Sequence, residues 1–152
     1  MLAICKSNLG SAIPSAERYL GEVDQTNYSP LSVGESYVVY ALLFIFDRVD
    51  FLVRAPEQPP FWVPSSLFHL VDARVSPDWE LCITQSRSDY KVLFNAFKIS
   101  HVMGYPLLVN DYNHYVGIAE RNPVEVLRFM ERELGCTPDS LKGLMVQKAQ
   151  ER

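Results

Sequence analysis

The sequence predicts an α+β fold, in which a mainly antiparallel sheet is followed by a C-terminal helical layer. Before residue 95, short apolar stretches rich in β-branched and aromatic residues alternate with turn residues, as in strands. After residue 106, apolar residues recur with the 3.6-residue period of a helix. We therefore expect a single domain over 1–152, with a β-rich part at about 31–95 and a helical part at about 106–149.

Composition and charge restrict the partners of the chain. Its 152 residues are 48% hydrophobic and 21% charged, which is typical of a globular domain with its own core. The net charge of -4 offers no basic excess for a phosphate backbone, so we expect no nucleic-acid partner. The longest apolar run, 37–46, is too short for a membrane helix, which needs about 20 residues. Cys5, Cys82 and Cys136 show neither disulfide nor zinc spacing, so we expect reduced thiols and a cytoplasmic location.

The strongest local signal is a pair of strands at 36–46 and 49–54, separated by Asp47 and Arg48. Two apolar runs with two polar residues between them predict a β-hairpin. Alternate residues of 36–46 point to opposite faces, and both faces are apolar. Either the fold covers this strand on both sides, or one side meets a partner.

Shorter elements complete the β-rich part. Three prolines in 55–60 exclude a central strand or a helix there, and 65–68 is predicted to form one helical turn. The remaining strands are predicted at 61–63, 69–72, 79–84, 90–94 and 99–103, with a hairpin loop at 85–89. This order of elements is typical of a small, strongly bent, SH3-like sheet.

Three helices are predicted in the last third of the chain. Residues 108–119 share one apolar face, and 123–134 is framed by an Asn122 cap and by Gly135. Thr137 and Pro138 begin a last helix that ends near residue 149. In the first 30 residues we predict a helical turn at 15–20 and otherwise irregular structure.

No motif in the sequence specifies catalysis. His69, His101 and His114 lack metal-ligand spacing, and no glycine-rich phosphate loop or nucleophile elbow occurs. His101 and His114 could act as acid and base in an RNase-like site only if a lysine or arginine lay beside them. We therefore expect no enzyme activity, no cofactor and no metal. The alternative is a small enzyme or ligand-binding domain with a pocket lined by Tyr and His.

Three segments carry a resemblance to a known group of proteins. They are LSVGESYVVY at 31–40, PFWVPSSLF at 60–68, and Asp78 with Trp79 after Asp72. This pattern over about 31–80 resembles small bacterial immunity proteins to polymorphic toxins of the contact-dependent growth inhibition and Rhs types. The resemblance implies a cytosolic, non-enzymatic inhibitor whose partner is a cognate toxin domain such as a nuclease. The sequence also allows a homodimer.

An inhibitor of a nuclease should place carboxylates, which mimic phosphate charge, beside aromatic anchors. One candidate surface comprises Asp47, Asp50, Glu57, Phe61 and Trp62. A second comprises Asp111, Tyr112, His114 and Tyr115. Asp47 and Asp50 flank the hairpin turn, where we expect solvated charges. In the alternative reading, Trp62 fills the interior.

Overall fold

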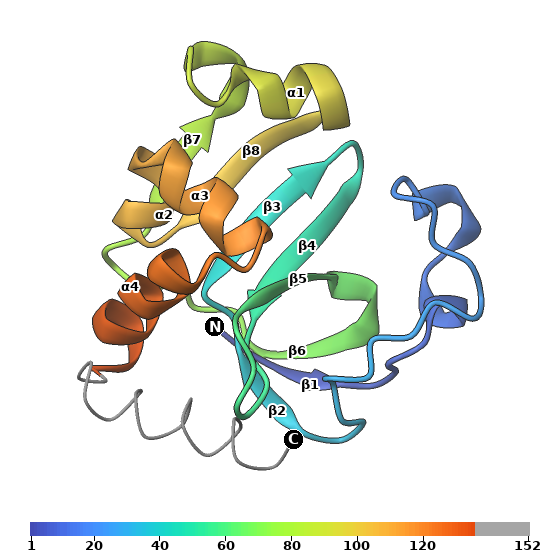
Figure 1. The fold of residues 1–152 in the computed structure, drawn as a ribbon. Coiled ribbons are helices and arrows are strands. Elements are labelled where there is room, and N and C mark those ends of the chain that lie inside the picture. Colours follow the sequence, from blue (N-terminus) through green and yellow to red (C-terminus); the bar gives the residue numbers. More distant parts are fainter. Residues whose placement is uncertain (136–152) are drawn as a thin grey trace.

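A computed structural model describes residues 1–135 of the chain, and it confirms the α+β class. The described residues form two antiparallel sheets and four α-helices (Figure 1). The strands that suggested one bent, SH3-like sheet are thus divided between two sheets. Among residues 1–135, no helix combines the length and apolar character needed to cross a membrane.

The larger sheet has the strand order β5-β4-β3-β8-β7. Its strands are β3 (Ala41–Ile45), β4 (Arg48–Val53), β5 (Phe61–Pro64), β7 (Glu80–Ile83) and β8 (Ile99–Gly104). The predicted hairpin is confirmed, because β3 pairs with β4 from Ala41 opposite Leu52 to Ile45 opposite Arg48. The turn lies at Phe46 and Asp47, one residue earlier than the predicted Asp47 and Arg48, because Arg48 already pairs with Ile45. Phe46 has a φ of 51°, in the region that favours glycine.

The smaller sheet has the order β2-β1-β6 and contains a strand that sequence reasoning missed. Its strands are β1 (Leu2–Cys5), β2 (Ser36–Val38) and β6 (Phe68–Asp72). The single strand predicted at 36–46 is wrong, since β2 and β3 belong to different sheets. The chain crosses between them at Val39 and Tyr40, whose backbone N–H groups donate to the carbonyls of Met1 and Leu52.

Two cores explain why both faces of 36–46 are apolar. Ala41, Leu43 and Ile45 are buried in a core that also contains side chains of the helices. Tyr37 and Val39 are buried in a second core with Ala3 and Phe68 of the smaller sheet. In Figure 1 the helices gather on one side of the larger sheet. One face of 41–45 is therefore covered by the helices, whereas on the opposite face Leu42 packs against the second core and Phe44 lies outside both cores.

The strand predicted at 90–94 is wrong, because these residues open helix α1 (Lys91–Phe97) inside the connection between β7 and β8. Tyr90 is fully buried, and its hydroxyl donates to the carbonyl of Leu108 at 2.6 Å. Leu93, three residues later, is buried on the same side, which is helical spacing. Five residues of which four are apolar or aromatic do not distinguish this pattern from a strand.

The predicted helix at 108–119 is interrupted, whereas the next one is confirmed. Asp111 separates α2 (Pro106–Asn110) from α3 (Tyr112–Ala119), and its carboxylate accepts from the backbone N–H of His114. Helix α4 (Pro123–Leu134) begins at the Asn122 cap and ends at Gly135, with φ of 63°. The helix predicted at 137–149 lies outside the described residues.

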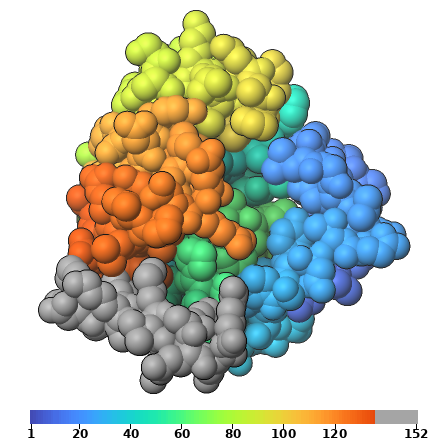
Figure 2. Space-filling model, viewed as in Figure 1, coloured from blue at the N-terminus to red at the C-terminus, as the bar shows by residue number. Residues whose placement is uncertain are grey.

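The first 35 residues extend beyond β1 as a long segment with two short 3₁₀ turns, Gly10–Ala12 and Ser15–Glu17, the second inside the predicted turn at 15–20. Gly10 lies against the backbone of this segment: a Cβ there would come 2.0 Å from the carbonyl oxygen of Val23. The face shown in Figure 2 is hollowed between this segment and the helical part of the molecule.

Candidate partner-binding cleft

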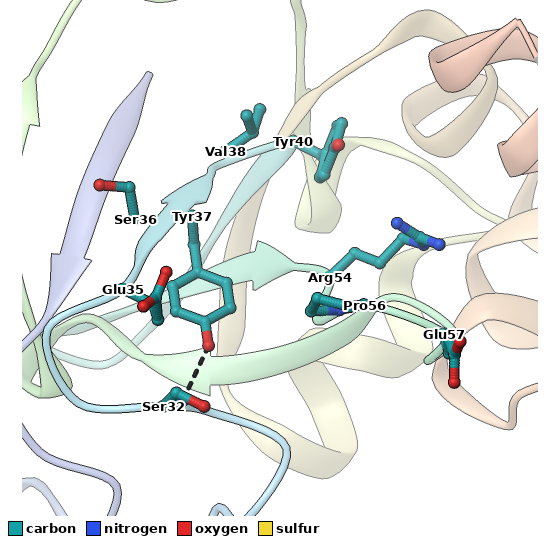
Figure 3. A pocket seen from close by; sticks show the side chains of 9 residues that line it. All are labelled: Ser32, Glu35, Ser36, Tyr37, Val38, Tyr40, Arg54, Pro56 and Glu57. Carbon is teal, nitrogen blue, oxygen red and sulfur yellow. Dashed lines mark hydrogen bonds between the residues drawn. The ribbon is translucent and has the colours of Figure 1, made fainter.

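An open cleft of about 630 Å³ lies where the chain passes from the smaller sheet to the larger one. Figure 3 shows the side chains that line it. They are Ser32, Glu35, Ser36, Tyr37, Val38, Tyr40, Arg54, Pro56 and Glu57. The cleft therefore combines two carboxylates, one guanidinium group and two tyrosines.

The two tyrosines are held in place by one hydrogen bond and one ring contact. Tyr37 is 4% exposed, and its hydroxyl accepts from the backbone N–H of Ser32 at 2.8 Å. The half-buried Tyr40 packs edge-on against Phe129 of α4, with 5.0 Å between ring centroids. Burial is the main cause of the raised pKa of Tyr40, so its hydroxyl stays protonated at neutral pH. Both rings are thus fixed, and the half-buried Tyr40 presents a neutral hydroxyl.

Arg54 follows β4 and carries an unused hydrogen-bond donor. Its Nε is buried, yet it has no hydrogen-bond partner among the described residues. An unsatisfied buried donor costs about 1–3 kcal/mol. The guanidinium group is a pre-organised fork that suits a carbonyl or carboxylate oxygen. An oxygen of a bound partner that reached this Nε would remove the cost.

Glu35 and Glu57 are the exposed acids of the cleft. In Figure 3 they lie at opposite ends of the lining side chains, with Tyr37 and Arg54 between them. Glu57 has a φ of 58° in a turn closed by the Gln58 N–H and the Ala55 carbonyl at 3.1 Å. Glycine would suit this backbone better. The protein thus keeps a carboxylate at a strained position on the rim of the cleft.

In the first predicted surface, the expectation that Asp50 is solvated and free to bind a partner is wrong. It is 3% exposed and makes a two-pronged ion pair with Arg48, with distances of 2.7 and 3.0 Å. Arg48 also contacts Glu22 at 2.6 Å and donates to the Glu17 carbonyl at 2.8 Å. The hydrogen bonds and charges of Asp50 and Glu22 outweigh burial and raise the pKa of Arg48. Asp50 therefore anchors the N-terminal segment and is unavailable to a partner.

The other members of that surface are dispersed. Asp47 is exposed at the hairpin turn, where the Tyr19 hydroxyl donates to it, and only Glu57 lines the cleft. Phe61 and Trp62 of β5 pack on opposite cores. The ring centroid of Trp62 lies 6.3 Å from that of Tyr115. This tryptophan therefore packs against the interior, as the alternative interpretation expected, and is not a surface anchor.

The second predicted surface is mostly buried. His114 is completely buried, with Nε2 2.9 Å from the Tyr105 hydroxyl and Nδ1 2.6 Å from a Glu125 oxygen. Arg128 extends this network to Glu125 at 3.0 Å and to Asp111 at 3.5 Å. Tyr115 is 5% exposed, and the half-buried Tyr112 stacks beside it. This group joins α3 to α4.

The three histidines lie apart in the fold. His69 is on β6, His101 is on β8 beside Phe44, and His114 lies in the network between α3 and α4. In the described part of the chain, no three His, Cys, Asp or Glu side chains are grouped to hold a metal ion. Cys5 and Cys82 are buried free thiols whose pKa values burial raises, which disfavours the reactive thiolate. Cys136 lies outside the described residues.

The buried His114 predicts a pH dependence of stability. Burial lowers its pKa below the ordinary value of 6.5, although Glu125 acts in the opposite direction. As the pH falls below 6.5, the unfolded chain therefore gains a proton that the folded chain resists, and the free energy of unfolding decreases. Urea unfolding between pH 7.5 and 5.5 should show this decrease, and His114→Gln should reduce it. The exposed His69→Gln is the control. An unchanged slope in His114→Gln would contradict the prediction.

Sequence reasoning missed most of the cleft. Of the predicted site residues, only Glu57 lines it, whereas Glu35, Tyr37, Tyr40 and Arg54 were not identified as site residues. Glu35, Tyr37 and Tyr40 do lie in the segment 31–40 that carries the resemblance. The signal was thus present in the sequence. What the sequence did not show is that the chain changes sheets there and leaves an open space.

Comparisons with protein families, with curated proteins and with solved structures find no match for this chain. The cleft, the ion cluster around Arg48 and the network around His114 are therefore interpreted from their own chemistry.

Proposed function

We propose that this chain is an immunity protein, which binds a cognate toxin domain in the cytosol and neutralises it without catalysis of its own. The observation that carries the proposal is the cleft, where the exposed Glu35 and Glu57 flank fixed tyrosine rings and the free Nε of Arg54. Tyrosine and arginine are frequent anchors of protein interfaces. The resemblance of 31–80 to immunity proteins also supports the proposal.

The cleft suits a protruding basic segment of a protein partner. Lysine or arginine side chains of the partner would pair with Glu35 and Glu57, and a backbone carbonyl would accept from Arg54 Nε. The net charge of -4 would steer such a partner toward the chain. A nuclease has this chemistry, because its substrate site is basic.

A small-molecule site is the second candidate, and the size of the cleft favours it. Its 630 Å³ falls within the roughly 300–1,000 Å³ of ligand pockets. The lining includes two tyrosines and no histidine, so the Tyr/His pocket of the alternative is met only in part.

A growth assay separates the two candidates. A cognate immunity protein should be encoded directly beside a large secreted toxin, so the C-terminal domain of the neighbouring gene product is the probe. We expect its expression to arrest growth and co-expression of this chain to restore growth. A toxic domain that this chain neither binds nor neutralises would contradict the immunity proposal and leave the small-molecule site as the better interpretation.

A further inference from the structure

One end of the larger sheet leaves an apolar face uncovered. The face opposite the helices is covered over β4 and β5 by the second core, which contains Phe51, Val53 and Val63. Toward β7 the strand register places two rows on that same face. The rows are Leu81, Met103 and Leu42, then Ile83, His101 and Phe44.

These rows meet solvent at β7. Leu81 is 54% exposed and Ile83 is 47% exposed, and the half-buried Phe44 and Met103 lie outside both cores. No Asp, Glu, Lys or Arg occurs in either row. The solvated face of an antiparallel sheet is normally polar. A continuous apolar face of this kind marks an interaction surface.

The same residues lie on a free sheet edge. β7 ends the strand order, so within residues 1–135 its outer edge pairs with no strand. Edge strands are usually protected by a charge, a proline or a bulge. β7 has one charge, Glu80 at its first position, which contacts Asn110 of α2, and residues 81–83 contain none of these features. Unpaired backbone groups and exposed apolar side chains therefore coincide on one short strand.

We propose that this surface binds a second copy of the chain by antiparallel pairing of β7 with its counterpart. A two-fold axis perpendicular to the sheet keeps the open faces of both copies on the same side. Residues directly opposite each other in an antiparallel pair point to the same face. Pairing centred on Cys82 meets this condition and places Leu81 of each copy opposite Ile83 of the other. The apolar rows then continue from one copy into the next.

Charge selects a second copy as the occupant. A basic partner is attracted to carboxylates, and this face offers none, whereas the cleft offers two. Two chains of net charge -4 repel each other least where they meet through the two rows, which contain no charged side chain. The dimer surface and the cleft also use different residues, so one copy can bind both partners.

The oligomeric state of the whole chain tests the proposal. Sedimentation should show a concentration-dependent dimer for the unmodified protein. Ile83→Lys, which places a charge in the joined apolar face, should raise the dissociation constant of the dimer at least tenfold. Val92→Lys on α1 is the matched control, because Val92 is 46% exposed and Ile83 is 47% exposed. A monomer at high protein concentration, or a dimer unaffected by Ile83→Lys, would overturn the proposal. Circular dichroism confirms that each variant is folded.

Cross-linking tests the pairing itself and keeps the proposal testable if a lysine variant fails to fold. In a background with Cys136→Ser, oxidation of an equal mixture of Leu81→Cys and Ile83→Cys chains should give covalent dimers. Either variant alone should give far fewer, because residue 81 faces residue 83. Equal yields from the mixture and from the single variants would contradict this register.

Discussion

Asp50→Ala is expected to lower the free energy of unfolding by about 3–5 kcal/mol, because it removes one partner of a buried ion pair. Arg48, 3% exposed, would lose both hydrogen bonds to the carboxylate, and its charge would remain balanced only by Glu22. The Arg48 cluster also holds the segment that contains Glu17 and Glu22 against the hairpin. We therefore expect cleavage of this segment by proteases to accelerate as well.

Asp47→Ala provides the control on the same hairpin. Asp47 is exposed and accepts one hydrogen bond from Tyr19, so its replacement should change stability by about 0.5 kcal/mol or less. Guanidinium chloride unfolding of both variants measures the contrast. A loss of under 1 kcal/mol in Asp50→Ala would show that the cluster contributes little. For the same reason, charge reversal at Asp47 and Asp50 together would test folding as much as binding.

The sequence was sufficient where local chemistry decides the structure. The β3–β4 hairpin, the proline-rich loop at 55–60 and helix α4 with its Asn122 and Gly135 caps follow from neighbouring residues alone. Asn122 illustrates this: its side chain accepts from the backbone N–H groups of Val124 and Glu125, two and three positions away. Such contacts leave a signature at fixed spacing.

The errors arose where distant residues decide the outcome. The chain breaks between β2 and β3 because the N–H of Val39 bonds to Met1 and the N–H of Tyr40 bonds to Leu52. Nothing between 36 and 46 encodes those two partners. Tyr90 likewise begins a helix where its hydroxyl can reach Leu108, eighteen residues away in sequence.

The candidate site suffered most from this limit. Asp50 was expected to be solvated. It is buried with Arg48 instead, and Arg48 is held by Glu17 and Glu22 of the first 30 residues, which are far from Asp50 in the sequence. His114 was expected at a surface, whereas Tyr105, the residue between β8 and α2, and Glu125 of α4 enclose it. Glu57 lies in an exposed loop as predicted, but most of its companions in the cleft come from residues 32–40, in and around β2.

Glu35→Lys combined with Glu57→Lys should slow the association of a basic toxin domain at least tenfold. Both acids are exposed on the rim of the cleft, so the double change replaces two attractive charges with two repulsive ones where the partner arrives. Stability should change little, since neither side chain is buried.

Glu57→Gly should relieve the backbone strain and stabilise the fold, while still weakening binding through the loss of its carboxylate.

Glu120→Lys combined with Glu131→Lys is the matched control. Both residues are exposed in the helical part, neither lines the cleft, and the net charge changes by the same amount. A general effect of net charge would slow association equally in both double variants. An effect of the cleft itself would slow association only in the double variant at Glu35 and Glu57.

The central claim is that the acidic, tyrosine-lined cleft receives the toxin domain. The most direct measurement is the association rate constant of that domain with the unmodified chain and with the two double variants, at low and at physiological salt. At low salt, we expect the association rate constant to fall at least tenfold in the cleft variant and in no other. At physiological salt the fall should be smaller, because salt screens the charges. Equal rates for the cleft variant and the unmodified chain, with full protection of growth, would contradict the claim.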